Sequence, residues 1–134
     1  MRLSPAAELA VRGVICLAEH HGEGPIRIAD ICRERDLRKE YLSKIFGSLA
    51  RADLITPVRG KGGGYMLARE PSEITVLEVI EAVEGPIVLN YCQHEPPQCD
   101  NEKCRLRPMW AEIQEFVRSK LRAMTLADCA CVDD

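Results

Sequence analysis

The stretch that decides the fold runs from Arg38 to Ala68 and reads RKEYLSKIFGSLARADLITPVRGKGGGYMLA. In its first part, residues 38–51, apolar side chains recur every three or four positions, which is the period of an amphipathic helix. The inner stripe consists of Leu42, Ile45, Phe46 and Leu49, and the outer face carries Arg38, Lys39, Tyr41, Lys44, Ser48 and Arg51. The pattern therefore predicts a helix whose outer face is polar and basic.

The second part of this stretch has the pattern of a β-hairpin. Residues 54–59 are mostly apolar or β-branched, residues 60–63 form a glycine-rich turn, and Tyr65 and Leu67 alternate within 64–68. Pro57 has no backbone N–H to donate, so its strand belongs at a sheet edge. Arg59 and Lys61 place positive charge at the tip of the hairpin, where it suits contact with backbone phosphate or the minor groove.

Two helices are expected before the decisive stretch, at about 4–20 and 27–35. Ser4 caps the first of them, and Pro5 loses no hydrogen bond at a first helical position. Only a few residues separate the helix at 27–35 from the helix at 38–51, a spacing typical of a helix-turn-helix. With the hairpin directly behind it, the arrangement is that of a winged helix-turn-helix.

Two further helices are expected after the hairpin. Thr75 and Glu78 form a capping box that begins one at about 75, and Gly85-Pro86 ends it. Residues 87–105 show no periodicity and are predicted to be a loop. A long helix then follows from Leu106 to about Met124, and its apolar face is wider than a lone surface helix needs, which favours pairing with a second copy. That face comprises Leu106, Met109, Trp110, Ile113, Phe116, Val117, Leu121 and Met124.

The expected architecture is mostly α with one small β-hairpin, in three parts that form one compact unit. Residues 1–86 make a winged helix-turn-helix DNA-binding domain, residues 87–105 a cluster-binding loop, and residues 106–134 a dimerisation helix and tail. The length of 134 residues is enough for one core.

Composition excludes several classes of protein. Hydrophobic residues make up 46% and charged residues 29%, as in a folded globular chain and unlike a disordered one. No apolar run approaches the roughly 20 residues that span a bilayer, and no signal peptide is recognisable. A cytoplasmic protein is therefore expected. Seven cysteines is an odd number, and cytoplasmic thiols stay reduced unless they bind metal or do redox work, so a disulfide framework is not favoured.

The distribution of charge favours a nucleic-acid partner even though the net charge is −3. From Arg27 to Lys61 the chain has nine Lys or Arg against five Asp or Glu, whereas the remainder is acidic. A basic segment in an acidic body places positive potential on one face, and that local potential is what phosphates respond to. The partner predicted is double-stranded DNA, bound by a dimer at a roughly two-fold symmetric operator.

The predicted loop contains the sequence's main metal-ligating pattern. Cys92, Cys99 and Cys104 lie within thirteen residues, and three thiolates favour a soft centre, either an iron–sulfur cluster or zinc. Zinc sites usually contain a tight Cys-x2–4-Cys knuckle, which is absent here, so the wider spacing favours a cluster. Scattered surface cysteines are the alternative. A fourth ligand has to come from elsewhere, and the candidates are His94, Glu8, a more distant cysteine or a small exogenous ligand.

Four stretches of the chain, together with the cysteine loop, resemble one family. They are MRLS with LAVR near the N-terminus, the wing RGKGGGYMLA at 59–68, VIEAVEGP at 79–86 and TLAD at 125–128. In that order they are similar to the iron–sulfur and nitric-oxide sensing repressors of the IscR/NsrR type, also called the Rrf-two family. The resemblance covers nearly the whole chain.

This resemblance implies a homodimer joined by the long helix, with each cluster (2Fe–2S or 4Fe–4S) near the partner's first helix. In the family, the fourth ligand is a histidine three residues after the last cysteine or a carboxylate of the partner's first helix. Here the first position is Arg107, which cannot ligate, and the second is Glu8. Glu8 is therefore the expected fourth ligand. Its alternative role is a favourable interaction with the helix dipole.

Taken together, these features predict a bacterial DNA-binding transcriptional regulator that senses iron–sulfur status, nitric oxide or redox state through the cluster. Repression is its expected action. DNA contacts are assigned to Arg38, Lys39, Tyr41, Lys44, Arg59 and Lys61, and Arg38 and Lys44 suit either guanine edges or phosphates. The alternative is a cluster-free regulator in which loop thiols oxidise to a disulfide.

Two other functions are not favoured, and four other cysteines are not expected to bind the cluster. A ferredoxin supplies all four cluster ligands itself, and no nucleophile–base pair or phosphate-binding loop indicates an enzyme. Cys16 and Cys32 are expected as small core residues. Cys129 and Cys131 are expected to be incidental.

Overall fold

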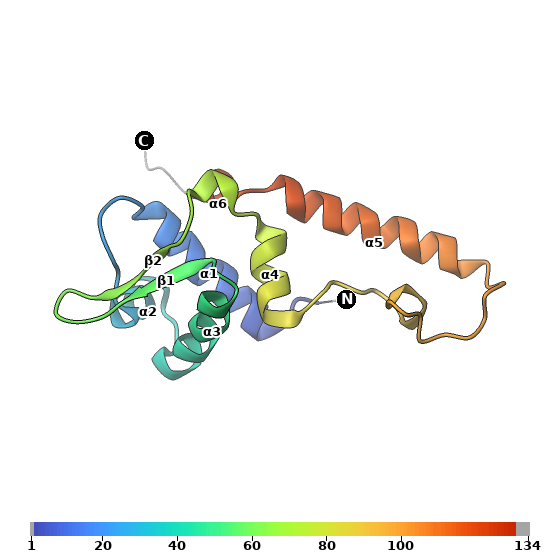
Figure 1. The fold of residues 1–134 in the computed structure, drawn as a ribbon, viewed down its shortest axis with the longest axis horizontal. Coiled ribbons are helices and arrows are strands. Elements are labelled where there is room, and N and C mark those ends of the chain that lie inside the picture. Colours follow the sequence, from blue (N-terminus) through green and yellow to red (C-terminus); the bar gives the residue numbers. More distant parts are fainter. Residues whose placement is uncertain (1, 131–134) are drawn as a thin grey trace.

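A computed structural model, which describes residues 2–130, shows a mostly helical chain with one antiparallel hairpin. Figure 1 shows the helices α1–α4 and the hairpin gathered at one end, while α5 extends from them. The elements are α1 (Pro5–Glu19), α2 (Ile28–Arg35), α3 (Lys39–Arg51), β1 (Ile55–Val58), β2 (Gly64–Leu67), a 3-10 turn η1 (Pro71–Glu73), α4 (Val76–Glu84), a 3-10 turn η2 (Tyr91–Gln93), α5 (Leu106–Ala123) and α6 (Leu126–Cys129).

The fold class expected from the sequence is confirmed, and the predicted elements differ from the observed ones by about one residue at their ends. The predicted start of α1 has its physical cause in the structure, because the Ser4 hydroxyl accepts a hydrogen bond from the backbone N–H of Ala7 at 3.1 Å. At the other end α1 stops at Glu19, before Gly22, and His20 is its C-cap.

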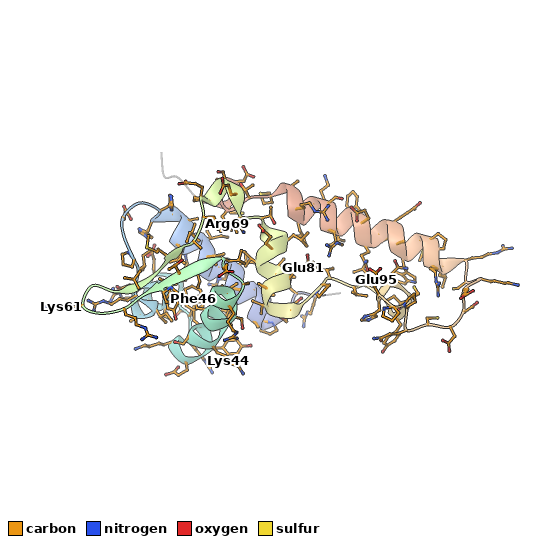
Figure 2. All side chains as sticks on the ribbon, in the orientation of Figure 1. Lys44, Phe46, Lys61, Arg69, Glu81 and Glu95 are labelled. Atoms are coloured by element: carbon orange, nitrogen blue, oxygen red, sulfur yellow. The ribbon has the colours of Figure 1, made fainter. Side chains whose placement is uncertain are left out.

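Phe46 occupies the centre of the core, where α1, α3 and β2 meet (Figure 2). Its side chain is fully buried, and its ring meets that of Tyr65 edge to face, with centroids 5.1 Å apart and planes at 77°. On the side facing α1, a Cβ at Gly13 would lie 2.8 Å from the Phe46 ring. Only glycine therefore lets α1 and α3 approach this closely.

The wing pairs in a single register, with Ile55 opposite Leu67 and Val58 opposite Gly64. It is also bound to the segment before α2, since Ile26 and Tyr65 exchange two backbone hydrogen bonds of 2.9 and 2.8 Å. Gly64 has a φ of 153°, and a Cβ there would lie 2.3 Å from the Ile26 carbonyl oxygen. The wing is thus fixed to the helix-turn-helix by backbone contacts that require this glycine.

Two capping boxes begin α4 and α6, and backbone pairing beside them attaches the C-terminal end of the described chain to the core. Thr75 and Glu78 cap α4 as expected, and Thr125 and Asp128 cap α6 in the same way. The backbone beside Thr75 pairs with that beside Thr125, and Leu126 is fully buried. Helix α6 was not predicted, because four residues are too few to show a period.

Two other details correct the sequence-based expectations. The segment 87–105 is not irregular throughout, since it contains the turn η2. The long helix ends at Ala123, and Met124 is extended because its carbonyl accepts from the Val76 N–H at 2.9 Å. Met124 therefore leaves the predicted apolar stripe of the helix.

Helix α5 has no buried residue anywhere along its length. Its apolar side chains include Phe116, which is 65% exposed, and Leu106, which is 54% exposed. Figure 1 shows the loop 87–105 leading away from α4, and α5 (orange to red) running back beside it toward the core. No helix among residues 2–130 is both long and apolar enough to cross a membrane.

Substitution of Gly13 tests the close packing around Phe46. We expect Gly13→Ala to lower the free energy of unfolding by about 1–3 kcal/mol, because the added methyl group overlaps the Phe46 ring. The matched control is Gly47→Ala in α3, where the nearest atom is the mobile end of Arg51 at 3.5 Å and a helix gains stability from alanine. Denaturant unfolding measures the free energy of unfolding of both variants and of the wild type. Equal or greater stability of Gly13→Ala would contradict the packing described.

Candidate functional site

Helices α2 and α3 form the helix-turn-helix, and the turn between them is sharp because Asp36 adopts a left-handed conformation with a φ of 53°. Helix α3 buries its predicted inner stripe and leaves the opposite face in solvent. All four residues predicted to contact DNA from this part of the chain are exposed. They are Arg38, Lys39, Tyr41 and Lys44. Arg38 is the N-cap of α3 and is exposed at the start of that helix.

The hairpin places its two predicted DNA-contact residues at an exposed tip. Gly60 and Gly62 have φ values of 96° and 80°, and Lys61 lies between them. Figure 2 shows Lys61 at the far end of the wing and Lys44 on α3, on the same side of the molecule as the helix-turn-helix. Arg59 is exposed as well.

A groove of about 590 Å³ lies between the wing and the beginnings of α2 and α3. Three cationic side chains line it, Arg27, Lys39 and Lys61, and no carboxylate does. Sequence reasoning missed Arg27, because its position before α2 carries no motif of its own. The pairing of Ile26 with Tyr65 brings Arg27 beside the wing, and this long-range contact has no local sequence signal.

The basic residues of this face make no ion pairs, unlike several arginines elsewhere in the described chain. Arg33 pairs with Asp30 and Arg118 with Glu81, at 2.5 and 2.9 Å. Within residues 2–130, no ion pair engages Arg27 or any of the five predicted cationic DNA contacts, which are Arg38, Lys39, Lys44, Arg59 and Lys61. Their positive potential is therefore free to act on an external polyanion.

The cysteine loop folds onto the beginning of α5. Cys92 lies in η2, and all three loop cysteines are half-buried with free thiols. The Gln93 amide donates both to the Cys92 sulfur at 3.3 Å and to the Arg107 carbonyl oxygen at 3.2 Å. These contacts tie the start of the loop to the first turn of α5.

Arg107 holds the other two cysteines of the loop. Its guanidinium donates to the Cys99 carbonyl oxygen at 3.0 Å, and its backbone N–H donates to the Cys104 carbonyl oxygen at 3.2 Å. Its Nε is buried and has no hydrogen-bond partner. A buried donor without an acceptor is costly, and the sulfur atoms of an anionic cluster accept hydrogen bonds. The donor set and this unpartnered N–H therefore fit an iron–sulfur group.

The three loop thiols do not meet the spacing of a single-ion site. Across the described part of the chain, one group of three ligand atoms lies within 4.8 Å of one another, and it contains none of the loop cysteines. Ligands of a cluster are spread further apart than ligands of one ion, so this spacing disfavours zinc at the loop as the site stands. The three cysteines are on one loop without converging to a point.

The two candidates for the fourth ligand lie in different places. His94 is in the loop, half-buried, with its ring stacked on Tyr91 at a centroid distance of 6.4 Å. Glu8 is exposed in the first turn of α1, and within residues 2–130 of one chain it joins no group of metal-ligand atoms.

The remaining described cysteines lie away from the loop. Cys16 and Cys32 are buried in the core, as expected. Burial, reinforced by the Glu34 carboxylate, raises the pKa of the Cys16 thiol to about 11. Cys129 is half-buried beside Ala7, Val76 and Ile80, and Cys131 lies outside the described residues.

Comparison with solved structures places the fold among bacterial regulators. The structure of CymR, the global cysteine regulator of B. subtilis, superposes with a TM-score of 0.87 and 31% identity, covering 100% of this chain and 99% of that one. The T. potens IscR structure superposes with a TM-score of 0.79 and 29% identity over 96% of this chain and 85% of that one.

Sequence relatives agree with the structural ones. A putative HTH-type transcriptional regulator of Azotobacter vinelandii is 34% identical over 100% of this chain and 82% of its own length. The transcriptional regulator IscR of Serratia proteamaculans is also 34% identical, over 96% and 78% respectively. The sequence profile of the Rrf2 family, described as an iron-dependent transcriptional regulator, matches residues 3–131. The chain belongs to the Rrf2 family of DNA-binding transcriptional regulators and is not an enzyme.

Proposed function

We propose that this regulator acts as a homodimer in the cytoplasm and that an iron–sulfur cluster held by Cys92, Cys99 and Cys104 controls its affinity for DNA. Residues 1–86 bind a roughly two-fold symmetric operator, 87–105 hold the cluster, and 106–134 join the two chains. When bound, such a group supplies metal–sulfur bonds that oxygen, nitric oxide or shortage of iron can break. Repression of the target genes is the outcome that we expect of the DNA-bound form.

The observation that carries this proposal is the buried, unpartnered N–H of Arg107, a residue whose other donors bind the backbone of Cys99 and Cys104. Arg107 already binds two backbone carbonyls of the loop with other donors, so its Nε–H is left for an acceptor such as a cluster sulfur. A thiol pair that merely oxidises to a disulfide gives this donor no strong acceptor. The arrangement therefore favours a cluster over the thiol-switch alternative.

The fourth ligand in this proposal is the partner's Glu8. Arg107 occupies the position at which the family resemblance expects a histidine, and a guanidinium cannot bind iron. Glu8 is exposed on α1 and so is available to another chain. The exposed apolar side chains of α5 support such a dimer, since a helix with no buried residue and with Phe116 65% exposed gains stability by covering that face.

Within one chain, Glu81 of α4 connects the loop to the DNA-binding part. Its carboxylate accepts from Arg118 of α5 at 2.9 Å and from the Ile87 N–H at 3.3 Å. Gln114 of α5 accepts from the Leu89 N–H at 3.0 Å. Helix α4 in turn packs against α1 and α3. Residues 92–104, when ligated, thus restrain α5 and α4, and through them the placement of each α3.

Removal of charge at the wing tip tests the DNA-binding face. We expect Lys61→Ala to weaken binding to all duplexes by a similar factor and to reduce the salt dependence of binding by about one unit of slope, because one phosphate contact is lost. Fluorescence anisotropy at several salt concentrations measures both the affinity and its salt dependence. The DNA used is an operator selected from random duplexes. Arg122→Ala in α5 is the control and leaves the slope unchanged. A changed base preference would show that Lys61 reads sequence instead.

Substitution of the loop cysteines tests the cluster. We expect the anaerobically purified protein to contain iron and acid-labile sulfide, and Cys92→Ser, Cys99→Ser and Cys104→Ser to be colourless. Operator affinity in these variants should change by a factor of about 5–150, the usual range of coupling between two sites. Cys129→Ser, also half-buried, is the control and keeps its colour. Wild-type protein without iron whose DNA binding responds to peroxide would support the thiol switch instead.

Substitution of Glu8 tests the fourth ligand. We expect Glu8→Gln to fold normally, because the residue is exposed, and to lose iron to a chelator at least tenfold faster than the wild type. Glu112→Gln, an exposed glutamate on α5, is the control. Cluster loss in His94→Ala with full retention in Glu8→Gln would assign the fourth ligand to His94.

A further inference from the structure

A second group of metal-ligating side chains lies between α1 and α2, in a part of the molecule that the regulator's proposed mechanism does not use. Cys16 lies in the last turn of α1 and His20 is the C-cap of that helix, four residues further on. Glu34, in the last turn of α2, faces them. The Cys16 sulfur, a ring nitrogen of His20 and a carboxylate oxygen of Glu34 lie within 4.8 Å of one another.

We propose that Cys16, His20 and Glu34 form a binding site for a borderline divalent cation of the zinc class, separate from the cysteine loop. One thiolate, one imidazole and one carboxylate are the ligand types that Zn²⁺ takes, and three protein ligands leave a fourth position for water. The site would join α1 to the first helix of the helix-turn-helix.

The distances between the ligand atoms suit a tetrahedral ion. The His20 Nε2 lies 3.0 Å from Oε1 and 3.2 Å from Oε2 of Glu34, and the Cys16 sulfur lies 3.6 Å from Oε2. Ligands about 2.0–2.3 Å from a tetrahedral zinc ion are roughly 3.3–3.6 Å apart. Small side-chain shifts are therefore enough to surround an ion.

The other ring nitrogen of His20 is already held in the way that metal-binding histidines require. Nδ1 lies 2.6 Å from a carboxylate oxygen of Glu23, so a neutral ring that donates from Nδ1 directs the lone pair of Nε2 toward Glu34 and Cys16. A carboxylate in this position fixes the tautomer and strengthens the imidazole as a ligand. The hydrogen bonds that the ring donates to Glu34 and Glu23 raise the pKa of His20, so a bound metal takes the place of the Nε2 proton.

The cation's charge is matched by the groups around it. Glu34, Glu23 and the Cys16 thiolate contribute negative charge, while Arg35 is the cation packed against the site and pairs with Glu19. Binding replaces the thiol proton, which leaves to solvent, with a metal–sulfur bond. The buried Nε of Arg35 has no partner among the described residues, and a metal-bound thiolate beside it is a better acceptor than a thiol.

The test uses the full chain carrying Cys92→Ser, Cys99→Ser and Cys104→Ser, reduced and freed of metal, so that the loop cannot contribute. We expect one equivalent of Co²⁺ to bind with a thiolate-to-cobalt absorption band, and Zn²⁺ to displace it. His20→Gln and Glu34→Gln should each weaken binding at least tenfold, and Glu23→Gln by about tenfold or more. Cys16→Ser should abolish the band.

The matched control is His21→Gln, because His21 is as exposed as His20 but pairs with Glu70 on the other side of the chain. It should bind Co²⁺ like the parent. Since Cys16 is fully buried and its variant is at risk of misfolding, the surface variants His20→Gln and Glu34→Gln decide the matter by themselves. Absence of the band in the parent, or equal binding by parent and His20→Gln, would overturn the site. Neither result bears on the loop cluster, which this background lacks.

Discussion

Packing of the Phe46 ring against Gly13 of α1 and Tyr65 of β2 is the contact on which the DNA-binding part depends. It brings α3, α1 and the wing together at one buried side chain. Gly64 adds a second close approach, between the wing and the backbone at Ile26. These close contacts fix how α1, α3 and the wing pack against one another. The proposed regulation therefore acts on how two such units are placed relative to each other, and not on the shape of either one.

The other half of the molecule has the opposite character. Helix α5 buries no side chain, and the cysteine loop rests on it through a few polar contacts made by Gln93, Arg107 and Gln114. Such a segment depends on additional interactions for its order, and the proposal supplies two of them, a second chain and a ligated loop. Glu81 is where this half meets the DNA-binding half, since one carboxylate binds both Arg118 and the backbone of Ile87.

Local patterns were sufficient to predict most of the fold. The spacing of Leu42, Phe46 and Leu49 predicted helix α3, and the glycines around Lys61 predicted the wing. The features that were missed depend on contacts between distant residues. Arg27 joins the basic groove because Ile26 pairs with Tyr65, and α6 forms because the chain beside Thr125 pairs with that beside Thr75. The unpartnered Nε of Arg107 and the meeting of Cys16 with Glu34 likewise have no signal in the order of residues.

The central claim is that the ligation state of the loop sets the affinity for DNA. Its most direct test is to divide one anaerobic preparation into samples whose iron and sulfide content is lowered stepwise with a chelator, and to measure operator affinity in each. The account predicts that affinity changes steadily with cluster content and returns when the cluster is rebuilt with iron and sulfide. The same affinity at every cluster content would contradict it.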